Sequence, residues 1–404
     1  MFVTLKEEIV QELQALAADG PVSNIKQPLY GRRLDNNSVI QVLSLHPEGL
    51  MPVGYALHTQ EPSLAGLASP VNDGQICLCL DNAKAPSFSC FIYDNARWQP
   101  VDYEIVRIQA NFYQRLQGLF DTGYLFDKKV TIIGLGTGGG LITLELAKNG
   151  VGHFQLVDFD RLQVHNVARH VCGLSDLGRY KTKAVAELIH NHHPQVMVTT
   201  AEYDILENRA KLKEIVTGSD LVIAATDSER SKRLINQVCW PQQIPVIYGA
   251  AYDRAFGGDV IRVIPPDTAC YECAFKQLVE LFETAPRKGE IDYAAEDVSK
   301  VIAEPGLGLD VAFIALIMSK MALLTLLRGS ESTLEDLPAD WILWGNQATW
   351  VFEKPLESIF MEVPVNPTCP VCRYEAYMAA ELGMTIDEAE AAGKAILESI
   401  QPEN

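Results

Sequence analysis

The spacing of apolar and polar positions changes at about residue 116. Before it, short apolar runs such as SVIQVLSL and QICLCL are separated by glycine, proline and asparagine, which indicates a small α+β domain. After it, apolar runs alternate with helical stretches, which is the pattern of a parallel sheet with helices on both faces. The strands expected in this sheet are KVTIIG, HFQLVD, MVTTAEYD, DLVIAATD and PVIYGA. The chain is therefore predicted to hold a Rossmann-like, doubly wound and mainly parallel sheet, preceded by a small α+β domain.

The alternation becomes looser after residue 265. We expect a helix at about 272–284, an apolar helix at 311–327, and strands near WILWGN and TWVFEK. The first residues, MFVTLKEEIVQEL, are interpreted as a helix rather than a signal peptide. Charged residues interrupt the apolar run that a signal peptide needs.

The C-terminal stretch TIDEAEAAGKAILESI predicts an acidic surface helix, with Thr385 as its N-cap and Glu388 completing a capping box. Three parts are predicted along the chain. They are an N-terminal α+β domain over 1–115 that binds a partner or substrate, a nucleotide-binding domain over 116–375, and an acidic helical tail over 376–404.

Composition narrows the classes of function. The formal net charge of −19 argues against nucleic-acid binding, since such proteins normally carry a basic face. The apolar run at 311–327 is shorter than the about 20 residues of a membrane span, so we expect a buried helix at the core or at a subunit interface. Nine cysteines in 404 residues do not make a disulfide scaffold, and four of them form two CxxC pairs. We expect metal binding in a reducing compartment, and hence a cytoplasmic location.

The stretch KKVTIIGLGTGGG predicts a strand that leads into a phosphate-binding turn. Gly134, Gly136 and Gly139 fit GxGxxG: the first permits a tight turn, the second lets the backbone approach phosphate, and the third permits close packing of helix on strand. Gly138 lies in the same turn and is expected to bind the nucleotide with them. Asp158 ends the next strand and can accept hydrogen bonds from a ribose. Taken alone, these residues fit an NAD enzyme as well as an ATP-binding one.

The residues that follow Asp158 favour ATP. Asp160, Asn166 and Arg169 lie in VDFDRLQVHNVARH, and Lys181 lies in GRYKTKA. A triphosphate needs more cations than a glycine turn supplies. An arginine can clamp phosphate with two hydrogen bonds, and a lysine adds a point charge. Each alone would more often be a solvated surface charge, so their grouping carries the prediction.

Asp227 ends the strand DLVIAATD at the carboxyl edge of the sheet, where ligands bind in folds of this kind. Its carboxylate is a candidate ligand for Mg²⁺, which prefers a few protein oxygens together with phosphate oxygens. The competing interpretation is a helix N-cap for the stretch that begins at Ser228.

Two CxxC pairs supply four thiolates, which is enough for one tetrahedral, structural zinc. They are Cys270 with Cys273 and Cys369 with Cys372, and such a site would staple a C-terminal segment onto the sheet. Two redox motifs are the alternative, but neither pair begins a thioredoxin-like helix after a strand. Among the other cysteines, Cys77, Cys79, Cys90 and Cys239 are expected in the core, and Cys172 near the nucleotide.

The motifs GLGTGGG, VDFDRLQVHNVAR, GRYKTK, ATDS, CYEC and CPVC stand in the order and spacing of a known family. Over about 110–375 the chain resembles the ThiF/MoeB-type adenylating enzymes of the ubiquitin-activating superfamily, such as bacterial activators of ubiquitin-like proteins. The resemblance implies a homodimer that uses ATP, Mg²⁺ and a structural Zn²⁺. It implies that the C-terminal carboxylate of a ubiquitin-like or sulfur-carrier protein attacks the α-phosphate of ATP, so that an acyl adenylate forms and pyrophosphate leaves. A conjugating enzyme is a further partner that it suggests.

In this family's pattern, Asp158 matches the ribose-binding acid and Asp227 the magnesium acid. The phosphate-handling residues match Asn166, Arg169 and Lys181.

Two further positions concern the same resemblance. Arg115 in FYQRL resembles, more weakly, an arginine on a helix that reaches into the partner subunit's site. His170 is a departure, because the family often has glutamine there; a histidine could alter phosphate contacts or add a pH-sensitive donor.

Many relatives pass the activated carboxylate to a cysteine after the first CxxC. Residues 274–368 contain no cysteine. Either the reaction stops at the adenylate, or the thiol lies elsewhere, or a cysteine has been replaced, in which case DYAAED is its expected place.

Two weaker motifs complete the sequence. HNHHP at 190–194 could hold a metal, but a solvated helix end is favoured. ALHTQEPSLAGLASPVND faintly resembles the signature of JAB-type zinc isopeptidases, yet only His58 fits its histidine pair and Gln60 stands at the second position. No isopeptidase activity is expected, since catalytic zinc needs three protein ligands.

Four functions remain open at this point. The leading one is activation of a carrier protein by adenylation. The others are adenylation of a short peptide's C-terminus with residues 1–115 as the clamp, an NAD-dependent oxidoreductase, and a non-catalytic scaffold with the same fold.

Overall fold

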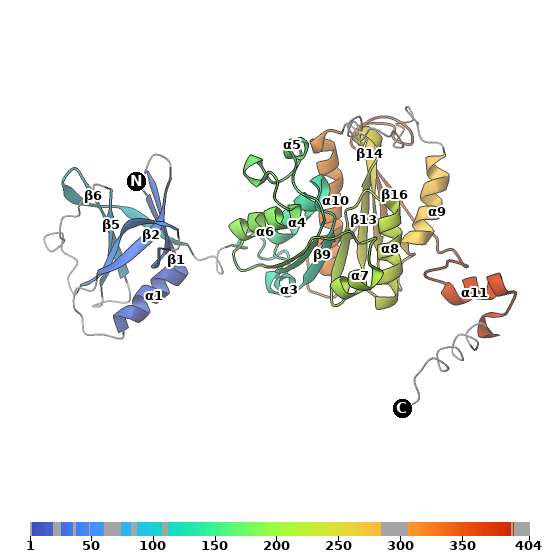
Figure 1. The fold of residues 1–404 in the computed structure, drawn as a ribbon, viewed down its shortest axis with the longest axis horizontal. Helices are drawn as coiled ribbons and strands as arrows, with labels where there is room; N and C mark the ends of the chain where they lie inside the picture. The colour runs from blue at the N-terminus through green and yellow to red at the C-terminus, as the bar shows by residue number, and fades with distance from the viewer. Residues whose placement is uncertain are drawn as a thin grey trace. The chain divides into compact units, whose positions relative to one another are not determined.

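The computed structural model describes residues 2–18, 26–34, 38–47, 49–59, 74–81, 87–106, 112–283, 306–388 and 391. The chain divides into two compact units, Met1–Arg115 and Leu116–Asn404 (Figure 1). Each unit has a sheet and a hydrophobic core of its own.

The N-terminal unit is an eight-stranded mixed sheet with helix α1 against it, in the order β7-β6-β5-β4-β2-β3-β1-β8. Its core contains Val3, Leu13 and Leu29, which are fully buried. The elements are β1 (Phe2–Lys6), α1 (Glu7–Ala18), β2 (Lys26–Leu34), β3 (Val39–Ser44), β4 (Met51–Thr59), β5 (Ile76–Asp81), β6 (Ser87–Asp94), β7 (Arg97–Pro100) and β8 (Asp102–Val106).

The helix predicted for the first residues is wrong over Phe2–Lys6. These residues form β1, which pairs in parallel with β3 and β8, and the helix begins at Glu7. Val3 and Leu5 alternate with more exposed neighbours, which is the period of a strand with one buried face. The JAB-like motif lies mostly outside the described residues: the backbone of His58 is in β4, while its side chain and all of Gln60 are outside them.

The second unit confirms the predicted Rossmann-like sheet. Its order is β11-β10-β9-β12-β13-β14-β15-β16, with parallel pairing from β11 to β13 and antiparallel pairing beyond. The strands are β9 (Lys129–Ile133), β10 (His153–Val157), β11 (Met197–Ala201), β12 (Leu221–Ala224), β13 (Val246–Ala251), β14 (Gly257–Val263), β15 (Trp341–Gly345) and β16 (Glu357–Met361).

Helices cover both faces of this sheet (Figure 1). One face carries α4, α6 and α10, whose Ile142, Val185 and Met321 share a core; the other carries α7, α8 and α9. The helices are α3 (Thr122–Phe126), α4 (Thr137–Lys148), α5 (Val164–Val167), α6 (Lys181–His192), α7 (Arg209–Val216), α8 (Glu229–Cys239), α9 (Tyr271–Phe282), α10 (Gly308–Leu326) and α11 (Tyr374–Leu382), with short 3-10 helices η2 (Leu174–Asp176), η3 (Trp240–Gln242) and η4 (Asp253–Ala255).

Helix α10 is the apolar helix that the sequence predicts. By length and composition it could cross a membrane, but more than half of its apolar stretch is buried against α4 and the sheet. Its buried side includes Ile314, Met318 and Met321, as expected of a core helix.

One strand prediction near the end of the sheet is wrong, and one strand there was not predicted. TWVFEK forms turns, and the strand follows it as β16. The apolar Trp350 in this segment packs against other aromatic rings instead of pairing in a strand. Its ring stacks on that of Phe282 at 5.3 Å and meets the ring of Tyr252 edge-on. The strand that was not predicted is β14, which is buried throughout. Its glycines and charges look like a loop, yet Gly258 is required because a Cβ there would lie 2.3 Å from Ile314 of α10.

The strand order creates a crevice at the carboxyl edge. From β9 the chain passes to β10 and β11 on one side, then returns to β12 on the other side of β9. The turns after β9 and β12 therefore diverge to opposite faces, and ligands of open α/β sheets bind at such a point.

Candidate nucleotide site and cysteine cluster

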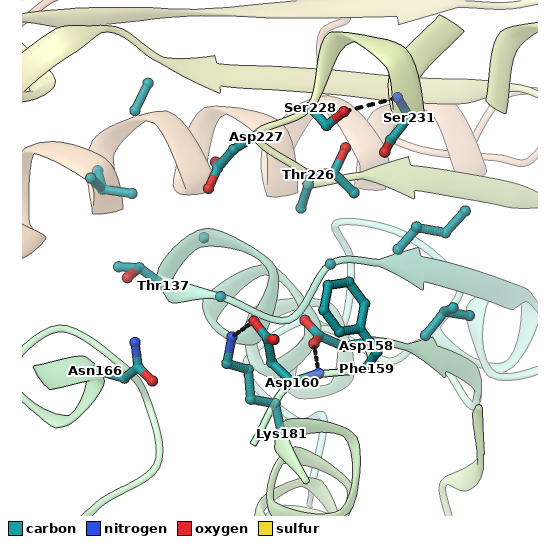
Figure 2. Close-up of a pocket in the computed structure, with 18 of the residues that line it drawn as sticks. Thr137, Asp158, Phe159, Asp160, Asn166, Lys181, Thr226, Asp227, Ser228 and Ser231 are labelled. Carbon is teal, nitrogen blue, oxygen red and sulfur yellow. Dashed lines mark hydrogen bonds and ion pairs between the residues drawn. The ribbon is translucent and has the colours of Figure 1, made fainter. Parts of the chain in front are cut away.

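A cavity of about 660 Å³ opens at this crevice. Its volume is that of a site for a small molecule. Its walls come from the turns that follow β9 to β13, from the start of α6, and from Val311 of α10. Nine residues singled out in the sequence line it: Gly134, Gly136, Gly138, Asp158, Asp160, Asn166, Arg169, Lys181 and Asp227. Figure 2 labels five of them, namely Asp158, Asp160, Asn166, Lys181 and Asp227.

The glycines of the turn after β9 do different things. Gly134 has φ 90° and a Cβ there would lie 2.5 Å from the Ala225 carbonyl oxygen, so only glycine fits. Gly136 is the N-cap of α4 and a Cβ there would meet nothing within 4 Å, which leaves its backbone open to a ligand. Gly139 does not line the cavity. A Cβ on Gly139 would lie 1.9 Å from the Gly134 carbonyl oxygen. Because glycine has no Cβ, α4 can pack closely against the turn.

Asp158 fastens the glycine turn to the end of β10. Its carboxylate accepts the backbone N–H of Leu135 at 2.6 Å and that of Asp160 at 2.7 Å. A carboxylate has about four lone-pair positions, so it can still accept a hydrogen bond from a ribose hydroxyl.

Lys181 and Asp160 form an ion pair in the wall of the cavity. The Lys181 ammonium donates to the Asp160 carboxylate at 2.7 Å, and the Lys181 side chain is only 9% exposed (Figure 2). An ammonium has three donors, so this pair leaves capacity for a phosphate oxygen. The structure thus gives Asp160 a partner that the sequence had not indicated.

Asn166 lies in the short helix α5, and Arg169 lies just after it. The Asn166 side-chain oxygen accepts the N–H of Gln163, so the amide nitrogen is the part of this group that remains to donate. Arg169 is half-buried, lines the cavity, and has no ion pair with any residue that the structure describes. Its guanidinium is therefore the cation best placed to take up phosphate charge.

Asp227 lies opposite the glycine turn and points into the cavity (Figure 2). The N-cap of α8 is Ser228, whose hydroxyl accepts the N–H of Ser231 at 3.3 Å. The alternative role of Asp227 as the cap is therefore wrong, because its neighbour performs it. An exposed carboxylate facing the turn has the oxygen donors that Mg²⁺ prefers.

Arg115, Cys172 and His170 do not line the cavity. Arg115 is exposed in a run of turns over 112–119, so the helix predicted to carry it is wrong, while its role in a partner subunit's site stays a prediction. Gly118 lies in the same run, and its positive φ of 84° is incompatible with a helix there. Cys172 is 4% exposed in the core, and burial raises the pKa of its thiol to about 12. The ring of His170 points to the backbone of the glycine turn instead of to the cavity.

The HNHHP stretch ends α6 as expected, but it is only partly solvated. His193 is 3% exposed and its ring packs 5.9 Å from that of Phe126. Among described residues, the group that could hold a metal is the four-cysteine cluster and not these histidines.

The two CxxC pairs come together although they lie 99 residues apart in the chain. All four sulfurs lie within 4.8 Å of one another; Cys270 is 3.5 Å from Cys369, and Cys273 is 3.6 Å from Cys372. These separations are too long for disulfides and close to the about 3.8 Å expected between thiolates on one tetrahedral zinc. Hydrogen bonds within the cluster lower the pKa of Cys273 and Cys369 and raise the pKa of Cys270 and Cys372. A metal would bind all four as thiolates.

Comparison with known proteins identifies the fold's family. The model of the ThiF family matches residues 113–345, which is more than half of the chain. The chain belongs to the ThiF family. It is 30% identical over 254 residues to the SAMP-activating enzyme E1 of Haloferax volcanii, covering 62% of this chain and 82% of that protein.

Two other similarities of this ThiF-family chain are more distant. Ubiquitin-like modifier-activating enzyme 5 of Drosophila mojavensis is 27% identical over 183 residues, and the match spans 41% of this chain and 46% of that one. This chain thus covers less than half of that relative. The structure of E. coli MccB with ATP is similar with a TM-score of 0.49 and 20% identity, over 62% of this chain and 68% of MccB.

The site of this ThiF-family chain includes residues that sequence reasoning missed. Phe159, Tyr203 and Ile205 line the cavity beside Asp158 and offer an apolar and aromatic wall that suits a nucleobase. Arg254 lines another part of it, in a left-handed turn with φ 55°. The rule that ligands bind at strand carboxyl ends points to these turns, but apolar residues in them look like core residues until the chain is folded.

Proposed function

We propose that this ThiF-family chain activates the C-terminal carboxylate of a ubiquitin-like or sulfur-carrier protein by ATP-dependent adenylation. The observation that carries the proposal is that Arg169, Lys181 and Asp227 share one cavity with the glycine turn. A redox dinucleotide needs the turn and the ribose acid, but not this set of charges. The names of the relatives, a SAMP-activating enzyme and a ubiquitin-like modifier-activating enzyme, support a carrier protein as the substrate.

The chemistry that we propose needs no general base. The attacking carboxylate is already ionised at neutral pH, because its reference pKa is about 4. One of its oxygens bonds to the α-phosphorus while the bond from that phosphorus to the bridging oxygen breaks, and pyrophosphate leaves with the electron pair. Arg169 and Lys181 would stabilise the charge that develops on the phosphates. Mg²⁺ held by Asp227 would supply further neutralisation of the leaving group.

The cysteines bear on what happens to the adenylate. All nine lie in the described part of the chain; eight are buried, and the ninth, Cys372, belongs to the four-cysteine cluster. None of them is an exposed thiol outside that cluster. We therefore propose that a nucleophile of another protein, such as the cysteine thiolate of a conjugating enzyme, attacks the acyl carbon of the bound adenylate directly. The new bond, a thioester in the case of a cysteine, forms as the bond from that carbon to the phosphate oxygen breaks and AMP leaves.

The homodimer stays a proposal that rests on the family resemblance. In it, Arg115 of each subunit would complete the site of the other. Its exposure and its place at the boundary of the two units are compatible with this role.

Pyrophosphate exchange tests the proposed function. Labelled pyrophosphate is incubated with the full chain, ATP and Mg²⁺, with a carrier protein that ends in glycine, with a short peptide, or with neither. Label should enter ATP only when the carrier is present, and the carrier should form no bond to the chain that a thiol reductant cleaves. Exchange with the peptide but not with the carrier would contradict a carrier-protein substrate and would support adenylation of a short peptide. NADH binding without any exchange would contradict it.

A further inference from the structure

His170 follows the cavity residue Arg169, yet its ring binds the backbone of the glycine turn. Its Nε2 lies 2.8 Å from the carbonyl oxygen of Leu135. Its Nδ1 lies 3.0 Å from the backbone nitrogen of Cys172, which donates to it. Both ring nitrogens are thus used by main-chain groups, one from each of two separate segments.

These partners determine the state of the ring. The Cys172 N–H can only donate, so Nδ1 must be an unprotonated acceptor. The Leu135 carbonyl can only accept, so Nε2 must carry the proton. The geometry therefore requires the neutral imidazole in a single tautomer.

We call these two hydrogen bonds of the His170 ring the tie, because they join the glycine turn to the segment of His170. The tie holds the carbonyl side of Leu135, whose N–H is already bound by another residue. Leu135 lies between Gly134 and Gly136, and its own N–H is bound by Asp158 at 2.6 Å. The ring also reaches the first turn of α4, where a Cβ on Gly140 would lie 3.4 Å from Nε2 of His170. The histidine thus fills the space between the glycine turn, the start of α4 and the segment that carries Arg169.

We propose that His170 is a positioning residue that keeps the glycine turn and Arg169 in one arrangement, and that it does so only while its ring is neutral. Protonation would place a hydrogen on Nδ1 facing the Cys172 N–H, so this hydrogen bond would be lost. Nε2 could still donate to the Leu135 carbonyl, but the repulsion between the two facing N–H groups would turn the ring away from the position in which it makes that bond. The consequence for ATP rests on the proposed function, whereas the tie between the two segments does not.

The groups around the ring determine the pH at which the tie is lost. Burial lowers the pKa of His170 from its ordinary value of 6.5, and the nearby Lys181 lowers it too. The hydrogen bond to Leu135 and the carboxylates of Asp158 and Asp176 act in the opposite direction. Because the net shift is downward, the tie is intact at neutral pH and is lost only as the pH falls below 6.5.

Two substitutions at this position separate packing from hydrogen bonding. His170→Phe keeps a ring of similar size but leaves the Leu135 carbonyl and the Cys172 N–H without their partner. His170→Gln keeps an N–H donor for Leu135 and does not titrate. His165→Gln is the matched control, because His165 is an exposed histidine in the same segment and does not line the cavity.

Hydrogen exchange of the backbone amides over 134–140, without nucleotide, tests the tie itself. At pH 7 we expect about tenfold faster exchange in His170→Phe, as for the loss of a buried hydrogen bond. His170→Gln and His165→Gln should stay near the unsubstituted protein. Equal protection in His170→Phe and the unsubstituted protein would overturn the proposal, whether or not the chain adenylates a carrier.

ATP binding and its pH dependence test the consequence. His170→Phe should bind ATP about tenfold more weakly at pH 7, by the same loss. The unsubstituted protein should lose affinity as the pH falls below 6.5, and His170→Gln should lose less affinity over the same pH series. The same acid loss in His170→Gln would overturn the role of ring protonation. Failure of the unsubstituted protein to bind ATP would instead contradict the proposed function, and the exchange experiment would still decide about the tie.

Discussion

At the scale of single residues, Asp227 and Ser228 show how two adjacent polar side chains divide their work. The Ser228 hydroxyl caps α8, which satisfies one of the free N–H groups at the start of that helix. Asp227 is consequently not needed as a cap and presents its carboxylate to the cavity. Sequence alone could not distinguish these roles, because aspartate and serine are both strong N-cap residues.

Substitutions at these two positions should therefore have opposite effects. Asp227→Asn should lower pyrophosphate exchange at least about a hundredfold, as for the loss of an electrostatic catalytic group. It should cost at most about 1 kcal/mol of stability through the helix dipole. Ser228→Ala should lower the free energy of unfolding by about 1 kcal/mol and leave exchange largely unchanged. Exchange rates and urea unfolding measure both effects, and full activity of Asp227→Asn would refute its role with magnesium.

At the scale of elements, the turn from β9 into α4 separates glycines needed for packing from glycines needed for a ligand. Gly139→Ala should lower the free energy of unfolding by about 3 kcal/mol or more, because its Cβ would overlap the Gly134 carbonyl oxygen. Gly136→Ala should change stability by less than about 1 kcal/mol, since its φ of −70° suits alanine and the Cβ meets nothing. It should still weaken ATP binding, because the methyl group would stand where the phosphates approach. Unfolding and ATP titrations of the two variants measure this contrast, which would be contradicted if Gly136→Ala bound ATP normally.

The elements that sequence predicted well are those whose pattern is local. The strands β9 to β13 are short apolar runs between helices, and α10 is a long one, so their periods are visible without a fold. The strand β14 was missed because Gly258 and Arg262 have roles set by distant partners: α10 packs over the glycine, and the arginine binds Asp336 at 2.7 Å. TWVFEK was mistaken for a strand because its aromatic residues serve a cluster between loops and α9.

The same limit applies to the candidate site. Sequence indicated Asp158, Arg169 and Asp227 because charged residues after strands stand out. It could not indicate that Lys181 is paired with Asp160, since this depends on the distance between two turns. It indicated only that His170 could alter phosphate contacts or add a pH-sensitive donor, whereas the ring is used by backbone groups.

At the scale of the whole molecule, the four-cysteine cluster joins distant parts of the second unit. It links the start of α9 to the segment between β16 and α11. That segment adds only a small apolar cluster with Ala269 and, at its edge, Trp240 and Val363. With so little buried surface there, we expect a metal ion bound by the four thiolates to be the main means of holding this segment to the sheet.

Zinc analysis and zinc removal test this link between α9 and the segment that precedes α11. The purified chain should hold one zinc, and Cys369→Ser should lose it, while Cys90→Ala, a buried cysteine of the N-terminal unit, should keep it. A cross-link that closes a loop of about 100 residues stabilises by roughly 4–5 kcal/mol in the chain-entropy model, so chelation should lower the free energy of unfolding by several kcal/mol. It should also speed tryptic cleavage after the exposed Arg373, because the segment that carries it is then released. Iron in place of zinc, or an unchanged cleavage rate after complete zinc removal, would contradict a structural zinc that fastens this segment.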